Sequence, residues 1–239
     1  MIFTFVGLSL LWLAGFQICR LCGARVDHRT NGWIEAGAGF FIATALLILW
    51  LSSMPASLSM ASWIAVLIST LFALPLCRTL MRAKFIGVRD FNLALLRAHL
   101  PHILIITLIS AHLALVLANN LSRDVYPWDA FTTWMYRAKV WVLNNELLAF
   151  QTVDQWLQSG GEGYALHAAH YPPSVSAIAA FASALSGNWS DQAASLPWFF
   201  ASLAIASLMF GLCRQAGFGN LLSLIGTYGL ISVPLVSMH

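Results

Sequence analysis

Acidic and basic side chains of the kind that catalyse group transfer gather in one stretch of this chain, residues 123–141. The stretch opens with a proline-bearing turn and continues with apolar residues at helical spacing. At about 100° per residue, one side of the helix collects Phe131, Trp134, Met135, Ala138, Trp141 and Val142, and the other collects Asp129, Thr132, Thr133, Tyr136 and Arg137. We therefore predict a helix in the membrane plane, with its aromatic side at the headgroups and its polar side toward the protein or the water.

Asp129 and Arg137 suit one class of reaction at a lipid boundary, the attack of an acceptor on a lipid-linked phosphosugar. A carboxylate can take the proton from the acceptor hydroxyl, and a cation can neutralise the departing polyprenyl phosphate. The alternative is structural: Asp129 would cap the N-terminus of the helix, while Arg137 and Lys139 would extend to lipid headgroups. Helix geometry alone favours the structural alternative.

A second motif follows this helix. Trp128-Asp129-Ala130-Phe131, Trp134 and Arg137-Ala138-Lys139 precede His170-Tyr171-Pro172-Pro173 and an alanine-rich segment by some thirty residues. Together these motifs resemble the first extracytoplasmic loop of the GT-C superfamily. Its members are membrane glycosyltransferases that use polyprenyl- or dolichyl-phosphate sugars, and they include the protein mannosyltransferase and aminoarabinose transferase families.

The resemblance implies an inverting glycosyltransferase whose catalytic acid falls on Asp129, in a loop with juxtamembrane helices. The resemblance also matches the motif that contains His170, and we predict Asp124, Tyr136, Arg137, Lys139 and His170 as the substrate-binding residues. The donor would be a polyprenyl-phosphate sugar, the acceptor and any need for a divalent ion stay open, and no cofactor or nucleic-acid partner is expected. The chain departs from the family at Ala130, where a second acid is common, at Tyr171, which interrupts the usual His-Pro-Pro, and in its four preceding spans.

Two other interpretations remain open. His167 and His170, with Asp154 and Glu162 nearby in sequence, could hold a metal ion through nitrogen and oxygen ligands, although their spacing matches no specific pattern. The whole chain could instead be a non-catalytic scaffold or transporter subunit, because an interfacial amphipathic helix serves a lipid-surface protein equally well. A transporter should have polar or broken spans at the middle of the membrane, and two of the spans are nearly featureless.

The elements that must position these residues cross a membrane. Hydrophobic residues make up 59% of the chain, charged residues make up 9%, and the mean hydropathy is +0.77, whereas a soluble domain carries about 25% charged residues. Apolar stretches of the roughly 20 residues that cross a bilayer occur at 1–19, 33–53, 61–80, 100–118, 195–213 and 220–238. The sequence therefore predicts an all-α polytopic bundle of about six spans in contact with membrane lipid.

The charges predict which side of the membrane each loop occupies. Basic residues follow the first and third spans, so those loops are predicted to be cytoplasmic. Six of the nine acidic residues lie in 119–194, so this loop is predicted to be extracytoplasmic, and we expect a bacterial inner (plasma) membrane. The apolar piece 174–186 of this loop is short for a membrane span. If it crossed the membrane, Arg214 would lie outside, so we predict an interfacial or re-entrant helix, which leaves Arg214 on the cytoplasmic side.

The chain thus divides into a four-span region, 1–118, a loop that carries the candidate site, 119–194, and two further spans, 195–239. The last span ends at His239 without a polar tail, which suggests the front part of a longer protein. Cys19 and Cys22 form a C-x-x-C pair, but the second pair or the βαβ context of a metal or redox site is missing.

Overall fold

The computed structural model describes residues 1–22, 28–54, 56–82, 93–124 and 130–233, and these residues form helices joined by short connections. The long helices are α1 (Ile2–Cys22), α2 (His28–Ser53), α3 (Leu58–Arg82), α4 (Leu93–Ser122) and α8 (Asp191–Gln215). The shorter ones are the π-helical turn η1 (Ala130–Trp134), α5 (Met135–Asn144), α6 (Val153–Gln158), α7 (Ser174–Ala184) and α9 (Asn220–Ile231). The predicted all-α bundle is confirmed.

Among the described residues, five helices are long and apolar enough to cross a membrane, and they lie in α1, α2, α3, α4 and α8. The described part of the predicted sixth span is α9, whose 12 residues are fewer than the roughly 20 that a crossing needs. Residues 234–238 of that span lie outside the described residues. The 11 residues of α7 are also too few to cross, which agrees with the prediction for 174–186.

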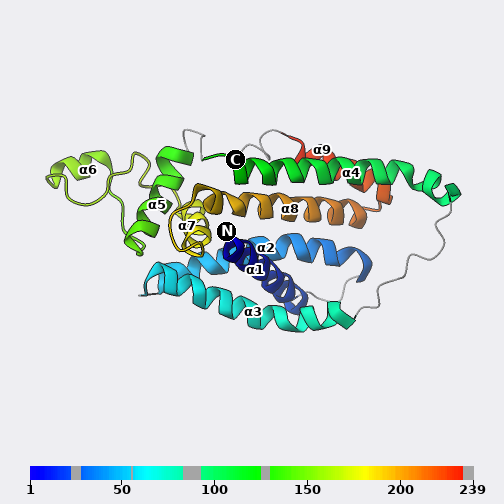
Figure 1. Ribbon diagram of the computed structural model, residues 1–239, viewed down its shortest axis with the longest axis horizontal. Coiled ribbons are helices and arrows are strands. Elements are labelled where there is room, and N and C mark those ends of the chain that lie inside the picture. The colour runs from blue at the N-terminus through cyan, green and yellow to red at the C-terminus, as the bar shows by residue number, and fades with distance from the viewer. Residues whose placement is uncertain (23–27, 55, 83–92, 125–129, 234–239) are drawn as a thin grey trace.

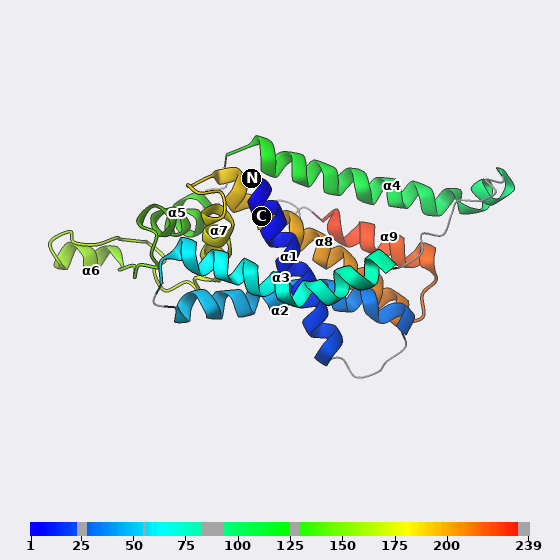
Figure 2. The same cartoon turned by 60° about the horizontal axis from the view of Figure 1, so that its bottom comes forward.

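Helices α2, α3, α4 and α8 run along the longest axis of the molecule, and α1 crosses them obliquely (Figure 1). Helices α5, α6 and α7 gather at one end of them. This end also holds the C-terminal end of α2, the start of α3 and the start of α8, as the second view confirms (Figure 2). The residues between α4 and α8 therefore form a cap on one end of the bundle. We call this part, residues 130–190, the cap.

Helix α7 is the most completely buried element of the cap. Each of its residues from 176 to 184 is buried, and α8, α5, α2, α3 and α1 all contact it. Its alanines and serines leave room for close approach, as small residues do where helices pack inside membranes. Thr4 of α1 donates a hydrogen bond to the Ala182 carbonyl oxygen at 3.0 Å, so the N-terminal helix is tied to the cap.

Glycine permits a close crossing of α1 and α2. A Cβ placed on Gly15 of α1 would collide with the backbone carbonyl of Gly39 in α2, and the converse collision would occur at Gly39. Glycine at both positions lets the two backbones touch, and van der Waals packing of this kind drives helix association in lipid. This crossing fixes α1 against α2.

Candidate functional site

Helix α5 carries three of the six residues that the sequence analysis selected, Tyr136, Arg137 and Lys139. Its C-terminal end is anchored to the bundle. The helix ends at Asn145, which has the left-handed backbone conformation at φ 54°. The Asn145 carbonyl oxygen accepts from the Leu58 backbone N–H at 2.9 Å, and its side-chain oxygen accepts from the Ser59 N–H at 2.8 Å. Asn145 therefore ends α5 and caps the first turn of α3 at the same time.

One side of α5 packs inside the protein. Met135, Ala138 and Trp141 are buried in the main hydrophobic core together with α7, and the Trp141 indole N–H donates to the Leu148 carbonyl at 2.7 Å. The expectation that this aromatic side lies at the lipid headgroups is therefore wrong for these three residues. The apolar surface of α7 covers them instead of lipid.

Arg137 also points into the protein. Its side chain is 3% exposed, and its two terminal nitrogens donate to the backbone carbonyls of Tyr171 at 2.9 Å, Ala169 at 3.1 Å and Ala168 at 3.4 Å. The guanidinium carbon lies 5.6 Å from the centre of the Phe150 ring. Arg137 thus gathers three carbonyl oxygens at the turn before α7.

The surroundings of the Arg137 guanidinium give it a structural role, because they occupy it with groups of the protein itself. Burial lowers the pKa of Arg137 from its ordinary value, but an arginine keeps its proton at neutral pH. The charge is therefore buried and is stabilised by the carbonyl dipoles that it holds. The Nε atom is buried too, and it has no hydrogen-bond partner among the described residues.

The opposite side of α5 borders a cavity of about 510 Å³, which we call the α5 cavity. Its polar lining residues are Thr132, Tyr136, Lys139, His167 and Asp191, and Trp189 lies beside them. Lys139 and His167 are exposed, and Tyr136 is 37% exposed. Two residues of the predicted site, Tyr136 and Lys139, therefore share one cavity, and Arg137 does not line it.

Asp124 lies near the start of α8, which contributes to the same cavity. The Gln192 side-chain amide donates to the Asp124 carboxylate at 3.3 Å, and the Trp189 indole N–H donates to the Asp191 carboxylate at 2.5 Å. Asp124 itself is exposed and does not line the cavity. The hydrogen bond to Gln192 joins the end of α4 to the first turn of α8.

His170 lies on the surface before α7. It is exposed, and its ring meets the Tyr171 ring edge to face with the centroids 4.9 Å apart. It is absent from the lining of the α5 cavity. Asp129, the predicted catalytic acid, lies outside the described residues.

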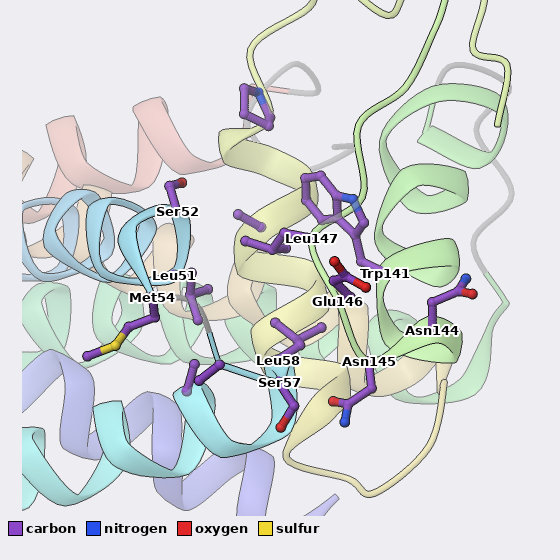
Figure 3. A pocket seen from close by; sticks show the side chains of 14 residues that line it. Leu51, Ser52, Met54, Ser57, Leu58, Trp141, Asn144, Asn145, Glu146 and Leu147 are labelled. Carbon is purple, nitrogen blue, oxygen red and sulfur yellow. The ribbon is translucent and has the colours of Figure 1, made fainter. Parts of the chain in front are cut away.

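A second cavity, of about 740 Å³, adjoins the C-terminal end of α5 (Figure 3). It lies between the α2–α3 turn, the end of α5 and the start of α7. Figure 3 shows Asn144, Asn145 and Glu146 around its polar part and Leu51 and Leu58 opposite them. None of the predicted site residues that the structure describes lines this cavity.

A metal site built from His167, His170, Asp154 and Glu162 is not formed. Within the part of the chain that the structure describes, no three histidine, cysteine or acidic side chains come together in a way that could hold a metal ion. All four residues belong to that part. Their closeness in sequence therefore does not become closeness in space.

Comparison with protein-family models, curated proteins and solved structures finds no match to this chain.

The α5 cavity also has polar and aromatic lining residues from outside η1 and α5, and the sequence analysis did not assign them to the glycosyltransferase site: His167, Trp189 and Asp191. They come from the loop before α7 and from the turn into α8, more than twenty residues after α5. No periodic pattern links them to α5. The aromatic and acidic types at 189 and 191 beside a predicted helix start are the only local signal that could have drawn attention to them.

Proposed function

We propose that this protein is a membrane glycosyltransferase of the GT-C type, which moves a sugar from a polyprenyl phosphate to an acceptor at the outer face of a bacterial plasma membrane. The observation that carries the proposal is the α5 cavity. It combines a cation, Lys139, with aromatic side chains and an imidazole, at the end of a bundle of membrane-crossing helices. Sites for small molecules typically have this form, an apolar wall with a few convergent polar groups.

The charges at the two ends of the bundle support an outward orientation of the cap. Arg20 and Arg214 lie in the last turns of α1 and α8. The last turn of α8 is at the end opposite the cap, and α1 runs obliquely away from the cap (Figure 1). The acidic residues Glu146, Asp154 and Glu162 belong to the cap. Positive charge favours the cytoplasmic side, so the cap and its cavity belong on the outer side.

Each group of the proposed site has a task. Asp129 takes the proton from the acceptor hydroxyl while the oxygen of that hydroxyl bonds to the anomeric carbon of the sugar. The bond from the anomeric carbon to the phosphate oxygen breaks at the same time, with inversion at that carbon. Lys139 neutralises the charge that develops on the departing polyprenyl phosphate. Asp129 is two residues before the cavity residue Phe131 in sequence, and two residues of chain span at most about 7 Å.

Arg137 enters this proposal in a different role from the one that its sequence position favours. Its two terminal nitrogens donate to the carbonyls of Ala168, Ala169 and Tyr171, which lie close to His167 in the chain. It is a positioning residue that holds the loop from which His167 reaches the cavity. Asp124, through Gln192, positions the start of α8 in the same way.

The test measures release of polyprenyl phosphate from a panel of donors that differ only in the sugar, with the purified chain in proteoliposomes. The Asp129→Asn variant should lose about 100-fold or more of the rate, the usual contribution of a general base. Asp154→Asn is the matched control, because Asp154 is an exposed acid of α6 that lines no cavity described above. Equal rates for Asp129→Asn and the wild type would remove the mechanism.

A second candidate is a non-catalytic assembly scaffold, and the exposure of α4 favours it. In the most apolar segment of α4, only 6% of the residues are buried within the chain, against 44% in the corresponding segment of α8. Such a helix offers a long surface to lipid or to another membrane protein. A chain that releases no polyprenyl phosphate from any donor, but cross-links to a partner through α4, would support the scaffold over the transferase.

A further inference from the structure

A third cavity, of about 630 Å³, lies between membrane-crossing helices, where α4, α8 and α9 meet. We call it the membrane groove. These three helices contact one another on the side of the bundle away from α3 (Figure 1). Most of its lining is aliphatic or aromatic, from Ile106, Ile109 and Leu113 on α4 to Leu203 and Phe210 on α8.

The groove is as long as one leaflet of a bilayer is thick. Its lining residues run from His102 to Leu113 on α4 and from Leu203 to Arg214 on α8, and at about 1.5 Å per residue each run spans about 16 Å. The hydrocarbon core of a bilayer is about 30 Å thick. Because α4 and α8 run in opposite directions (Figure 1), His102 and Arg214 lie toward the same end of the groove, and Leu113 and Leu203 toward the other.

The basic groups of the groove, His102 and Arg214, lie at the end away from the cap. Arg214 lies in the last turn of α8, and its guanidinium is anchored by a hydrogen bond to the Phe218 carbonyl at 2.6 Å. The Nδ1 atom of His102 is buried and has no hydrogen-bond partner in the described part of the chain. Trp33 lines the same cavity and is 51% exposed, as indoles are where hydrocarbon meets headgroups.

We infer that the membrane groove binds one anionic phospholipid, with its phosphate at Arg214 and His102 and an acyl chain between α4 and α8. Water is a poor occupant, because it needs two to four polar partners and most of this lining offers none. Hydrocarbon suits the lining, and basic pockets between membrane helices bind anionic headgroups. The site lies at the end of the bundle opposite the α5 cavity, so it is independent of the proposed transferase activity.

The bound lipid also accounts for the position of α4. Its main contacts within the described residues are with α8 and α9, and the groove separates part of its inner face from those helices. An acyl chain in the groove would supply the packing that protein side chains do not supply there. The lipid is therefore a structural component that joins α4 to the rest of the bundle.

The experiment is native mass spectrometry of the full chain, purified in detergent and exposed to equal amounts of phosphatidylglycerol and phosphatidylcholine. The wild type should retain one lipid per chain and should prefer phosphatidylglycerol about fivefold, the usual effect of one basic residue. Arg214→Gln should lose this preference. Arg20→Gln is the matched control, because Arg20 also lies in the last turn of a membrane-crossing helix, α1, but outside the groove.

A second pair of variants tests the apolar part of the groove. Ala206→Leu fills space between α4 and α8 and should lower retention of both lipids, whereas Ala111→Leu, on the exposed face of α4, should leave retention unchanged.

Arg214→Lys keeps the charge and should keep the preference for phosphatidylglycerol, which covers the case in which Arg214→Gln fails to fold. Equal retention of the two lipids by the wild type, equal effects of Arg20→Gln and Arg214→Gln, or a dimer without lipid would each overturn the inference.

Discussion

The two sides of α5 present two cations only two residues apart, and the structure gives them opposite environments. Arg137 is 3% exposed and donates to three backbone carbonyls. Lys139 is exposed and borders the α5 cavity. A basic residue near a candidate acid is thus a poor guide to function by itself, because the partners of its donors decide whether it holds the fold together or remains open to a ligand.

The largest effect that this comparison predicts is the loss of Arg137. Arg137→Gln removes the charge and leaves the carbonyls of Ala168, Ala169 and Tyr171 without their donors. A buried carbonyl left without its hydrogen bond typically costs about 1–3 kcal/mol, so the three together cost about 3 kcal/mol or more. For a chain of this size that is roughly 6–12 °C in the apparent melting temperature. Intrinsic tryptophan fluorescence during heating in detergent measures the shift.

Arg137→Lys sharpens the same experiment. A lysine keeps the charge but offers a single ammonium where the guanidinium fork spans three carbonyls, so we expect a loss of intermediate size. If Arg137→Gln melts within 1–2 °C of the wild type, roughly the shift of a neutral surface change, the division of α5 into a structural side and a ligand side is wrong.

The second effect concerns the junction that fixes the orientation of α5. Asn145→Ala removes the side-chain cap on the Ser59 N–H and leaves an alanine in the left-handed conformation. Each change costs about 1 kcal/mol, so the melting temperature should fall by less than for Arg137→Gln. Asn145→Gly loses the cap but tolerates the conformation, and it should fall between Asn145→Ala and the wild type. A glycine variant less stable than the alanine variant would contradict the assignment.

The sequence predicted the fold better than the site, and the reason is physical. A bilayer requires helices of a certain length and polarity, so hydropathy alone locates α1, α2, α3, α4 and α8. The core of the cap is set instead by contacts between distant segments.

The faces of α5 illustrate that limit. The periodicity correctly grouped Met135, Ala138 and Trp141, but it could not reveal that α7 would cover them in place of lipid. Likewise, Arg137 fell on the polar side of the helical wheel, yet carbonyls of residues 168–171 make a buried position favourable for it. His167 reaches the cavity through the same loop, and no local pattern indicates it.

A smaller effect on stability should distinguish Ser176 and Ser183, two fully buried serines of α7. The Ser183 hydroxyl donates to the Asn188 carbonyl and accepts from the Ser190 N–H at 2.9 Å, whereas the Ser176 hydroxyl has no partner among the described residues. Ser183→Ala should destabilise the cap by about 1 kcal/mol. Ser176→Ala should be neutral or slightly stabilising, because it removes a buried polar group that forms no hydrogen bond. Equal losses in the two variants would show that Ser176 has a role that its surroundings do not reveal.

The smallest effect on stability belongs to Lys139, and it completes the comparison within α5. Lys139→Gln should leave the melting temperature unchanged within error, because the side chain is exposed and surface substitutions seldom matter. The same variant should weaken binding of a polyprenyl phosphate about tenfold or more, because it removes one charge-assisted hydrogen bond, and Lys139→Arg should restore most of it. Two outcomes would contradict a ligand-binding role for Lys139. The Lys139→Gln variant could bind the lipid phosphate as well as the wild type does, or it could melt at as low a temperature as Arg137→Gln. The α5 cavity would then lack its cation.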